Sequence, residues 1–239
     1  MDEDARLHAQ LGHYARLLWD IQKLRIQVGN RISAIERDAA AHGLSAALWT
    51  QPHEATLKNL ETQERSLNGQ LERLVKQKHF MAAWIDACPG LGFAGFARIV
   101  GVTGDFRRFA TVSKVWKYMG LHTEDGQAPR RQRGAKLGYA PQGRVVARQI
   151  AESIVKLGRG RYRELYDRKR LEYVQRERHG ESGCPFGQVH KDRNGKLLAC
   201  VKQAENKETS AHVHSAAMRY AVKQLLKDLW VAWRRDESG

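Results

Sequence analysis

Two long runs of apolar residues, spaced alternately three and four apart, constrain most strongly what this chain can fold into. The first run comprises Leu7, Leu11, Tyr14, Leu18, Ile21, Val28, Ile32 and Ile35, with one interruption at Arg25. The second run comprises Leu57, Leu60, Leu67, Leu71 and Leu74. This spacing places apolar side chains on one seam of an α-helix, and a seam of about four heptads is typical of a coiled coil.

A short break separates the two runs and predicts a turn between two helices. Gly43 favours the end of the first helix, and Ser45 can cap a short turn after it. Two helices with a short connection form an antiparallel hairpin, so we expect a coiled-coil hairpin as the first domain, residues 1–78. Because a lone hairpin leaves apolar edges exposed, we expect residues 5–78 to form a homodimer, a higher oligomer or a contact with another protein.

The charge balance points to polyanionic partners. Among 239 residues, 41 Lys and Arg outnumber 26 Asp and Glu, which gives a formal net charge of +15. A surface of this sign attracts polyanions. No apolar run approaches the about 20 residues that span a bilayer, and the acidic start MDEDARLHAQ does not resemble a secretory signal. Three cysteines, Cys88, Cys184 and Cys200, do not make a disulfide framework. We therefore expect a cytoplasmic, nucleoid-associated protein with no membrane partner.

The second expected domain, residues 79–239, begins with a helix-hairpin-helix pattern. The string Cys-Pro-Gly-Leu-Gly at residues 88–92 lies between two apolar helices, and its proline ends the first of them. Gly90 and Gly92 can adopt positive φ and carry no side chain that would keep a ligand away, while Leu91 anchors the turn from beneath. The helix that follows presents free N–H groups to an anion such as a DNA phosphate. The alternative is a plain helical corner that uses glycine to turn tightly.

The rest of this domain is predicted to be mainly helical. Helices are expected over residues 111–119, 145–157, 161–178 and 212–235. Residues 182–208 form an insert in which Asn194-Gly195 predicts a small β-hairpin. The expected fold class is therefore mainly α, with a long helical hairpin followed by a helical domain that contains the helix-hairpin-helix and the small β-hairpin insert.

Basic residues concentrate between residues 107 and 148. This stretch holds two acids, Glu124 and Asp125, against ten basic residues. The ten are Arg107, Arg108, Lys114, Lys117, Arg130, Arg131, Arg133, Lys136, Arg144 and Arg148. All of them except Lys117 join Gly90, Leu91 and Gly92 as candidate nucleic-acid-binding residues. Arginine's planar fork suits backbone phosphates, so we expect binding that weakens steeply with salt. The alternative is a solvated basic loop.

The spacing of the sequence predicts no catalytic residue, no metal and no cofactor. Zinc-ligand types occur at Cys184, His190, Cys200, His212 and His214, but the close pairs of the usual structural zinc sites are missing. The acidic residues are scattered rather than clustered as two metal ions require. No Gly-rich nucleotide loop occurs either.

A family resemblance adds a biological context. The run ACPGLGFAGFARIVGVTGDFRRFATVSKVWKYMGL resembles the C-terminal domain of the Piv/MooV insertion-sequence transposases and DNA invertases, some of which use a bridge RNA. The matching positions are Pro89-Gly90-Leu91-Gly92, Gly104-Asp105, Arg108-Phe109 and Gly120-Leu121. The later GRVVARQIAESIVK and HVHSAAMRYAVKQLLKDLWVAWR are similar too, and the family places a coiled coil where the hairpin is expected. The resemblance implies DNA binding and dimerisation in DNA transposition or recombination.

Two departures from the family separate binding from catalysis. Full-length members begin with a RuvC-like domain that carries four acidic metal ligands, for which this sequence has no room ahead of the hairpin. Members also carry a catalytic serine in the loop after Gly-Leu, where this chain reads HTEDGQAPRRQRGAKLGYAPQG. Asp125 lies near the expected place but cannot replace a serine nucleophile, and Thr123 comes early in the loop.

We therefore expect a transposase-related DNA-binding protein that does not cleave strands by itself, and whether it takes part in an enzyme stays open. One alternative is an active recombinase subunit completed by a separate RuvC-like protein. Another is an RNA-binding or scaffolding protein, because basic loops do not distinguish structured RNA from DNA well.

Overall fold

The computed structural model describes residues 3–124, 128–129, 134, 136–174 and 210–236. Its helices are α1 (Glu3–Ala41), α2 (Ala47–Lys76), α3 (His79–Asp86), α4 (Gly92–Thr103), α5 (Val112–Tyr118), α6 (Pro141–Leu157), α7 (Arg161–Val174) and α8 (Ser210–Arg235), with a 3-10 turn, η1, at Phe106–Arg108. The described residues contain no β-strand, and the predicted mainly α fold class is confirmed. The β-hairpin predicted within residues 182–208 lies outside the described residues. None of the helices in these ranges combines the length and the apolar character needed to cross a membrane.

The chain divides into two compact units. Unit 1 comprises Met1–Ala87 and Leu91–Arg108, and unit 2 comprises Cys88–Gly90 and Phe109–Gly239. This division differs from the domain boundary expected after residue 78, because α3 and α4 belong with the long hairpin. A direct backbone contact explains the grouping of α4 with α1: a Cβ built on Gly101 would lie only 2.9 Å from the Cα of Gly12.

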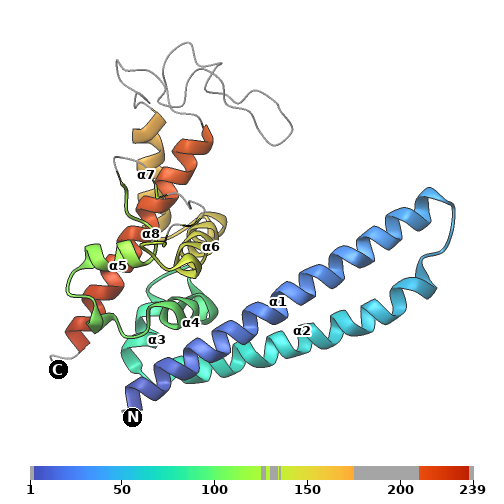
Figure 1. Cartoon of the computed structure of the whole chain (residues 1–239), viewed down its shortest axis with the longest axis horizontal. Coiled ribbons are helices and arrows are strands. Elements are labelled where there is room, and N and C mark those ends of the chain that lie inside the picture. Colours follow the sequence, from blue (N-terminus) through green and yellow to red (C-terminus); the bar gives the residue numbers. More distant parts are fainter. Residues whose placement is uncertain (1–2, 125–127, 130–133, 135, 175–209, 237–239) are drawn as a thin grey trace. The chain divides into compact units, whose positions relative to one another are not determined.

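Unit 1 is built on the hairpin of α1 and α2, which run antiparallel and in contact (Figure 1). The heptad residues Leu11, Leu18 and Leu71 are fully buried along its seam. The turn between the helices is short, since α1 continues to Ala41 and α2 begins at Ala47. The apolar seam therefore determines the pairing of the two helices over most of their length.

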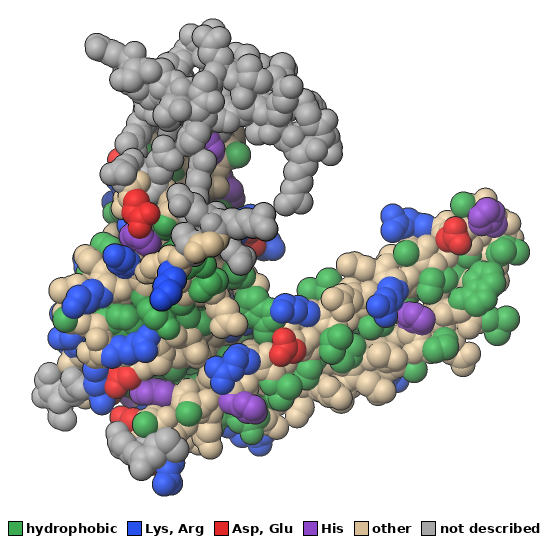
Figure 2. Space-filling view, viewed as in Figure 1, with side chains coloured by type: hydrophobic (Ala, Val, Ile, Leu, Met, Phe, Trp, Pro, Cys, Tyr) green, Lys and Arg blue, Asp and Glu red, His purple; other side chains and the backbone are tan. Residues whose placement is uncertain are grey.

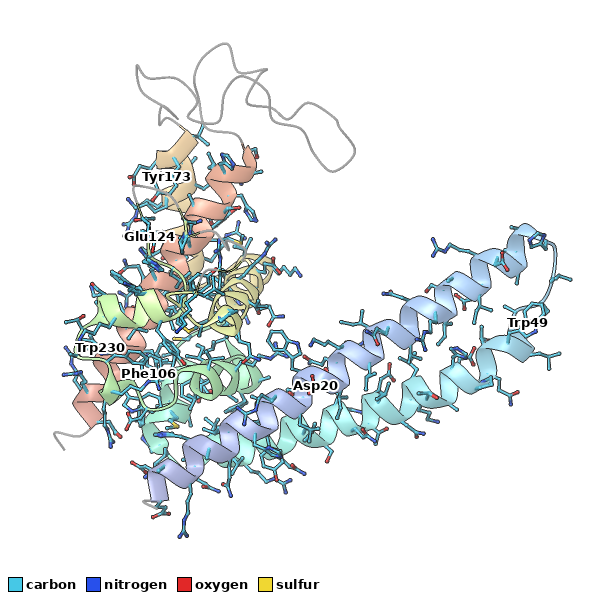
Figure 3. All side chains as sticks on the ribbon, viewed as in Figure 1. Asp20, Trp49, Phe106, Glu124, Tyr173 and Trp230 are labelled. Carbon is cyan, nitrogen blue, oxygen red and sulfur yellow. The ribbon has the colours of Figure 1, made fainter. Side chains whose placement is uncertain are left out.

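The turn of the hairpin exposes large apolar side chains. Leu44, Leu48 and Trp49 are 56%, 84% and 53% exposed, and hydrophobic side chains are visible at this end of the hairpin in Figure 2. Trp49 lies close to the turn (Figure 3). We name these three residues the hairpin tip. An apolar patch of this kind on a helical hairpin is a candidate contact surface.

Unit 2 is organised around α8, which contacts α5, α6 and α7 (Figure 1). The face of α8 that packs against the rest of the unit is apolar. It includes Leu225, Leu226, Leu229 and Trp233, all almost fully buried. The Trp230 indole N–H donates a hydrogen bond of 3.0 Å to the Phe109 carbonyl oxygen, which fixes the C-terminal half of α8 in the unit. The position of α8 in turn determines which of its polar residues lie next to α5 and α6.

Candidate functional site

The corner at residues 89–92 was the first expected anion site. Gly90 has a φ of +93°, and its carbonyl oxygen accepts a hydrogen bond of 2.6 Å from the Ser153 hydroxyl of α6. A Cβ on Gly90 would lie 3.2 Å from the Cα of Ile154, so this glycine permits close packing on α6. Leu91 is buried and Gly92 is exposed at the start of α4. Packing within unit 2 thus accounts for Gly90, and only Gly92 of these three residues is exposed.

The two arginines of η1 lie in unit 1, and Arg107 contacts two carboxylates. The Arg107 guanidinium lies 3.6 Å from Asp4 and 3.9 Å from Asp105. The pKa of Asp4 is lowered, first by a hydrogen bond from the Lys78 ammonium and also by the charge of Arg107. Arg108 is exposed. Arg107 therefore forms local ion pairs within unit 1.

The remaining candidates from the basic stretch belong to unit 2. Lys114 of α5 and Lys136 are exposed. Arg130, Arg131 and Arg133 lie outside the described residues. The structure brings the last two candidates, Arg144 and Arg148, together on α6 beside a pocket.

This pocket has a volume of about 190 Å³ and lies between α6 and α8. Arg144 and Arg148 of α6 line it together with Arg219 of α8, and Lys223 follows Arg219 one turn later on α8. We name these four residues the α6–α8 cation cluster. Figure 2 shows Lys and Arg side chains on the visible face of unit 2. Among the described residues, no Asp or Glu side chain lines the pocket.

Arg144 is held in place at the pocket by the segment that precedes α6. Its guanidinium donates hydrogen bonds to the Pro129 carbonyl oxygen at 2.6 Å and to the Tyr139 hydroxyl at 3.3 Å, and it lies 5.8 Å from the centre of the Tyr139 ring. Gly120 makes this arrangement possible, because a Cβ there would lie 2.7 Å from the Tyr139 ring and its φ is +65°. Arg144 is therefore a fixed rather than a freely moving cation.

The environment of Arg219 and Lys223 disfavours their positive charges. Burial lowers the pKa of Arg219, and repulsion from Arg144 lowers it further. Burial likewise lowers the pKa of Lys223, with a smaller effect of the Arg219 charge. Within the described residues, Arg148 is the one member of the cluster in an ion pair, with Glu152 at 2.9 Å. A bound anion would favour the charged forms of both side chains and so offset the effects of burial and repulsion.

Contacts with the uncharged Trp116 side chain position Lys223 of α8. The Lys223 ammonium lies 4.9 Å from the centre of the Trp116 ring, and the Trp116 indole N–H donates a 2.9 Å hydrogen bond to the Lys223 carbonyl oxygen. A cation over an indole face is attracted by the ring but keeps its charge available to a ligand. Lys223 is thus held on α8 without a carboxylate partner in the described part of the chain.

Sequence reasoning had not selected Arg219 and Lys223. A signal existed, since they are four residues apart on a predicted helix whose neighbouring positions Met218 and Val222 are apolar and buried. Two basic residues next to the apolar face of a helix differ from basic residues on its solvent-exposed face. The partners of Arg219 and Lys223 on α6, however, lie about seventy residues earlier in the chain, so only the packing of α6 on α8 reveals the cluster.

The zinc ligands considered from sequence give no metal centre in the described residues. No group of three or more His, Cys, Asp or Glu side chains is arranged there to hold a metal ion. Cys184, His190 and Cys200 lie outside those residues. His214 instead hydrogen-bonds through Nδ1 with the Tyr166 hydroxyl at 2.7 Å, between α8 and α7.

Comparisons of the chain with protein-family models, with curated proteins and with solved structures give no significant match.

Proposed function

We propose that this chain is a nucleic-acid-binding protein that grips backbone phosphates with the α6–α8 cation cluster. The observation that carries the proposal is a pocket lined by three guanidinium groups, of which that of Arg219 is half-buried without a carboxylate partner in the described residues. Arginine pairs with phosphate through two parallel hydrogen bonds, and such charge-assisted bonds are the strong ones. The net charge of +15 supplies the long-range attraction that brings a polyanion to this site.

The family resemblance supports DNA as the polyanion and transposition or recombination as the process. In this proposal the chain contributes DNA binding, and self-association through the long hairpin, without a serine nucleophile of its own. Exposed Lys114 and Lys136 of unit 2 add phosphate contacts that carry no sequence information.

The proposal is tested by binding of the full chain to a fluorescent DNA duplex at low salt. The double variant Arg219→Gln, Lys223→Gln removes two charges from the cluster. Its matched control, Arg168→Gln, Arg170→Gln, removes two exposed charges from α7. Because each hydrogen bond to a charged group contributes about 1.5–3 kcal/mol, we expect the cluster variant to bind at least about a hundredfold more weakly.

The control variant should lose only a small part of the affinity, because exposed charges act weakly and at long range. Equal losses in the two variants would show that net charge alone attracts DNA, and absence of binding at low salt would overturn the proposal. Competition by single-stranded DNA and by structured RNA of equal length identifies the preferred nucleic acid.

A further inference from the structure

The pocket beside the α6–α8 cation cluster is small. Its volume of about 190 Å³ lies below the about 300–1,000 Å³ of pockets that take drug-sized ligands. At about 30 Å³ for each water molecule, it has room for about six waters. A phosphate group, with its phosphorus and four oxygens, fits this space together with a few waters.

The charge around the pocket exceeds that of one backbone phosphate. Three guanidinium groups line it, and the one carboxylate paired with them in the described residues belongs to Glu152, on Arg148. A phosphodiester within a strand carries a single negative charge. A phosphate monoester carries about −1.5 to −2 at pH 7 and offers three terminal oxygens, so it neutralises this cluster more completely.

The cations also differ in depth. Arg148 is exposed, with 74% of its side chain accessible, whereas Arg144 and Arg219 are half-buried. A phosphate in the middle of a strand has a nucleoside on each side and must leave the pocket in two directions. A phosphate at the end of a strand has one covalent neighbour, so it can pass Arg148 and reach the two half-buried guanidinium groups.

We propose that this pocket binds the terminal phosphate monoester at the end of a nucleic-acid strand. Arg144 and Arg219 contact the terminal oxygens, Arg148 contacts them at the rim, and the exposed Ser215 hydroxyl of α8 adds a hydrogen-bond donor. This inference rests on the proposed function, because it names the part of the nucleic acid that the cluster recognises.

The test uses the full chain and three short single-stranded oligonucleotides of one sequence, with a 5′-phosphate, a 3′-phosphate or hydroxyl groups at both ends. We expect one phosphorylated oligonucleotide to bind at least about tenfold more tightly than the hydroxyl form, which corresponds to about 1.4 kcal/mol. The advantage should shrink below about pH 6, where the monoester dianion takes up a proton and becomes a monoanion. Inorganic phosphate should weaken the binding of the phosphorylated form more than that of the hydroxyl form, because it competes for the contacts that the terminal phosphate makes.

Variants assign the effect to the pocket. Arg219→Gln should abolish the preference for the phosphorylated end, and Arg170→Gln on α7 should retain it, with circular dichroism verifying that both are folded. Equal binding of all three oligonucleotides by the unmodified chain would overturn this inference but leave the proposed function intact. A preference that persists in folded Arg219→Gln would also overturn it, whereas absence of binding to any oligonucleotide or duplex would overturn both.

Discussion

Replacing Gly101 by alanine should destabilise unit 1, although alanine is the better helix former. The Cβ of an alanine at position 101 would lie 2.9 Å from the Cα of Gly12 on α1. Carbon atoms pack best at about 3.5–4.0 Å, so α1 and α4 would have to separate by roughly 0.6–1.1 Å at this crossing. The atom nearest to the added Cβ is the backbone Cα of Gly12, so no flexible side chain can move aside to make room.

The expected magnitude follows from two opposing effects. Overpacking of a close contact costs about 1–3 kcal/mol. Exchange of glycine for alanine within a helix stabilises by about 1 kcal/mol. We therefore expect the free energy of unfolding to fall by up to about 2 kcal/mol in Gly101→Ala.

A matched substitution isolates the contact from helix propensity. Gly69 lies within α2, and no atom lies within 4 Å of a Cβ built there. Gly69→Ala should therefore stabilise the protein by about 1 kcal/mol. Urea unfolding followed by circular dichroism, with a separate transition allowed for each unit, measures both variants. If Gly101→Ala stabilised the protein as much as Gly69→Ala, the close crossing of α1 and α4 would be refuted.

Three further predictions concern a buried thiol, an indole and the hairpin tip. Burial raises the pKa of Cys88 to about 11. Iodoacetamide at pH 8 should therefore label this thiol much more slowly in the folded chain than in urea, as measured by peptide mass spectrometry. Rapid labelling of the folded chain would contradict the burial of Cys88. Since the folded chain holds this proton more tightly, the resulting stability is present below the ordinary value of 9.0 and is lost as the pH rises towards 11. Trp230→Phe removes the hydrogen bond to the Phe109 carbonyl oxygen and should lower the free energy of unfolding by about 0.5–1.5 kcal/mol in urea titrations. An unchanged unfolding midpoint would contradict this prediction. Leu48→Ser with Trp49→Ser should reduce self-association in sedimentation equilibrium at unchanged helix content, and an unaltered oligomeric state would exclude the tip as the contact.

The long hairpin could be predicted because its seam is a local, repetitive pattern. Burial of Leu11, Leu18 and Leu71 requires apolar residues every three or four positions, and this periodicity is visible in the sequence. The division into units could not be predicted in the same way. It depends on the contact of Gly12 with Gly101, two glycines about ninety residues apart that have no local reason to meet.

The candidate site was predictable only in part, for a similar reason. Arg144 and Arg148 could be predicted because they belong to the basic stretch of residues 107–148, and they do line the pocket. Arg219 and Lys223 were missed because their neighbours on α5 and α6 are distant in sequence. Gly90 was interpreted as an opening for a ligand, whereas the structure uses its missing side chain for packing on Ile154. Glycine alone does not distinguish these two uses.

A salt titration of DNA binding is the decisive measurement for phosphate gripping by the α6–α8 cation cluster. For a duplex, the logarithm of the association constant falls linearly with the logarithm of salt concentration, with a slope of about −0.9 for each phosphate neutralised. We predict a steep slope for the unmodified chain and a slope that is shallower by about 1–2 for Arg219→Gln, Lys223→Gln. A slope identical to that of the unmodified chain, or affinity that does not depend on salt, would contradict the assignment of these cations to phosphate binding.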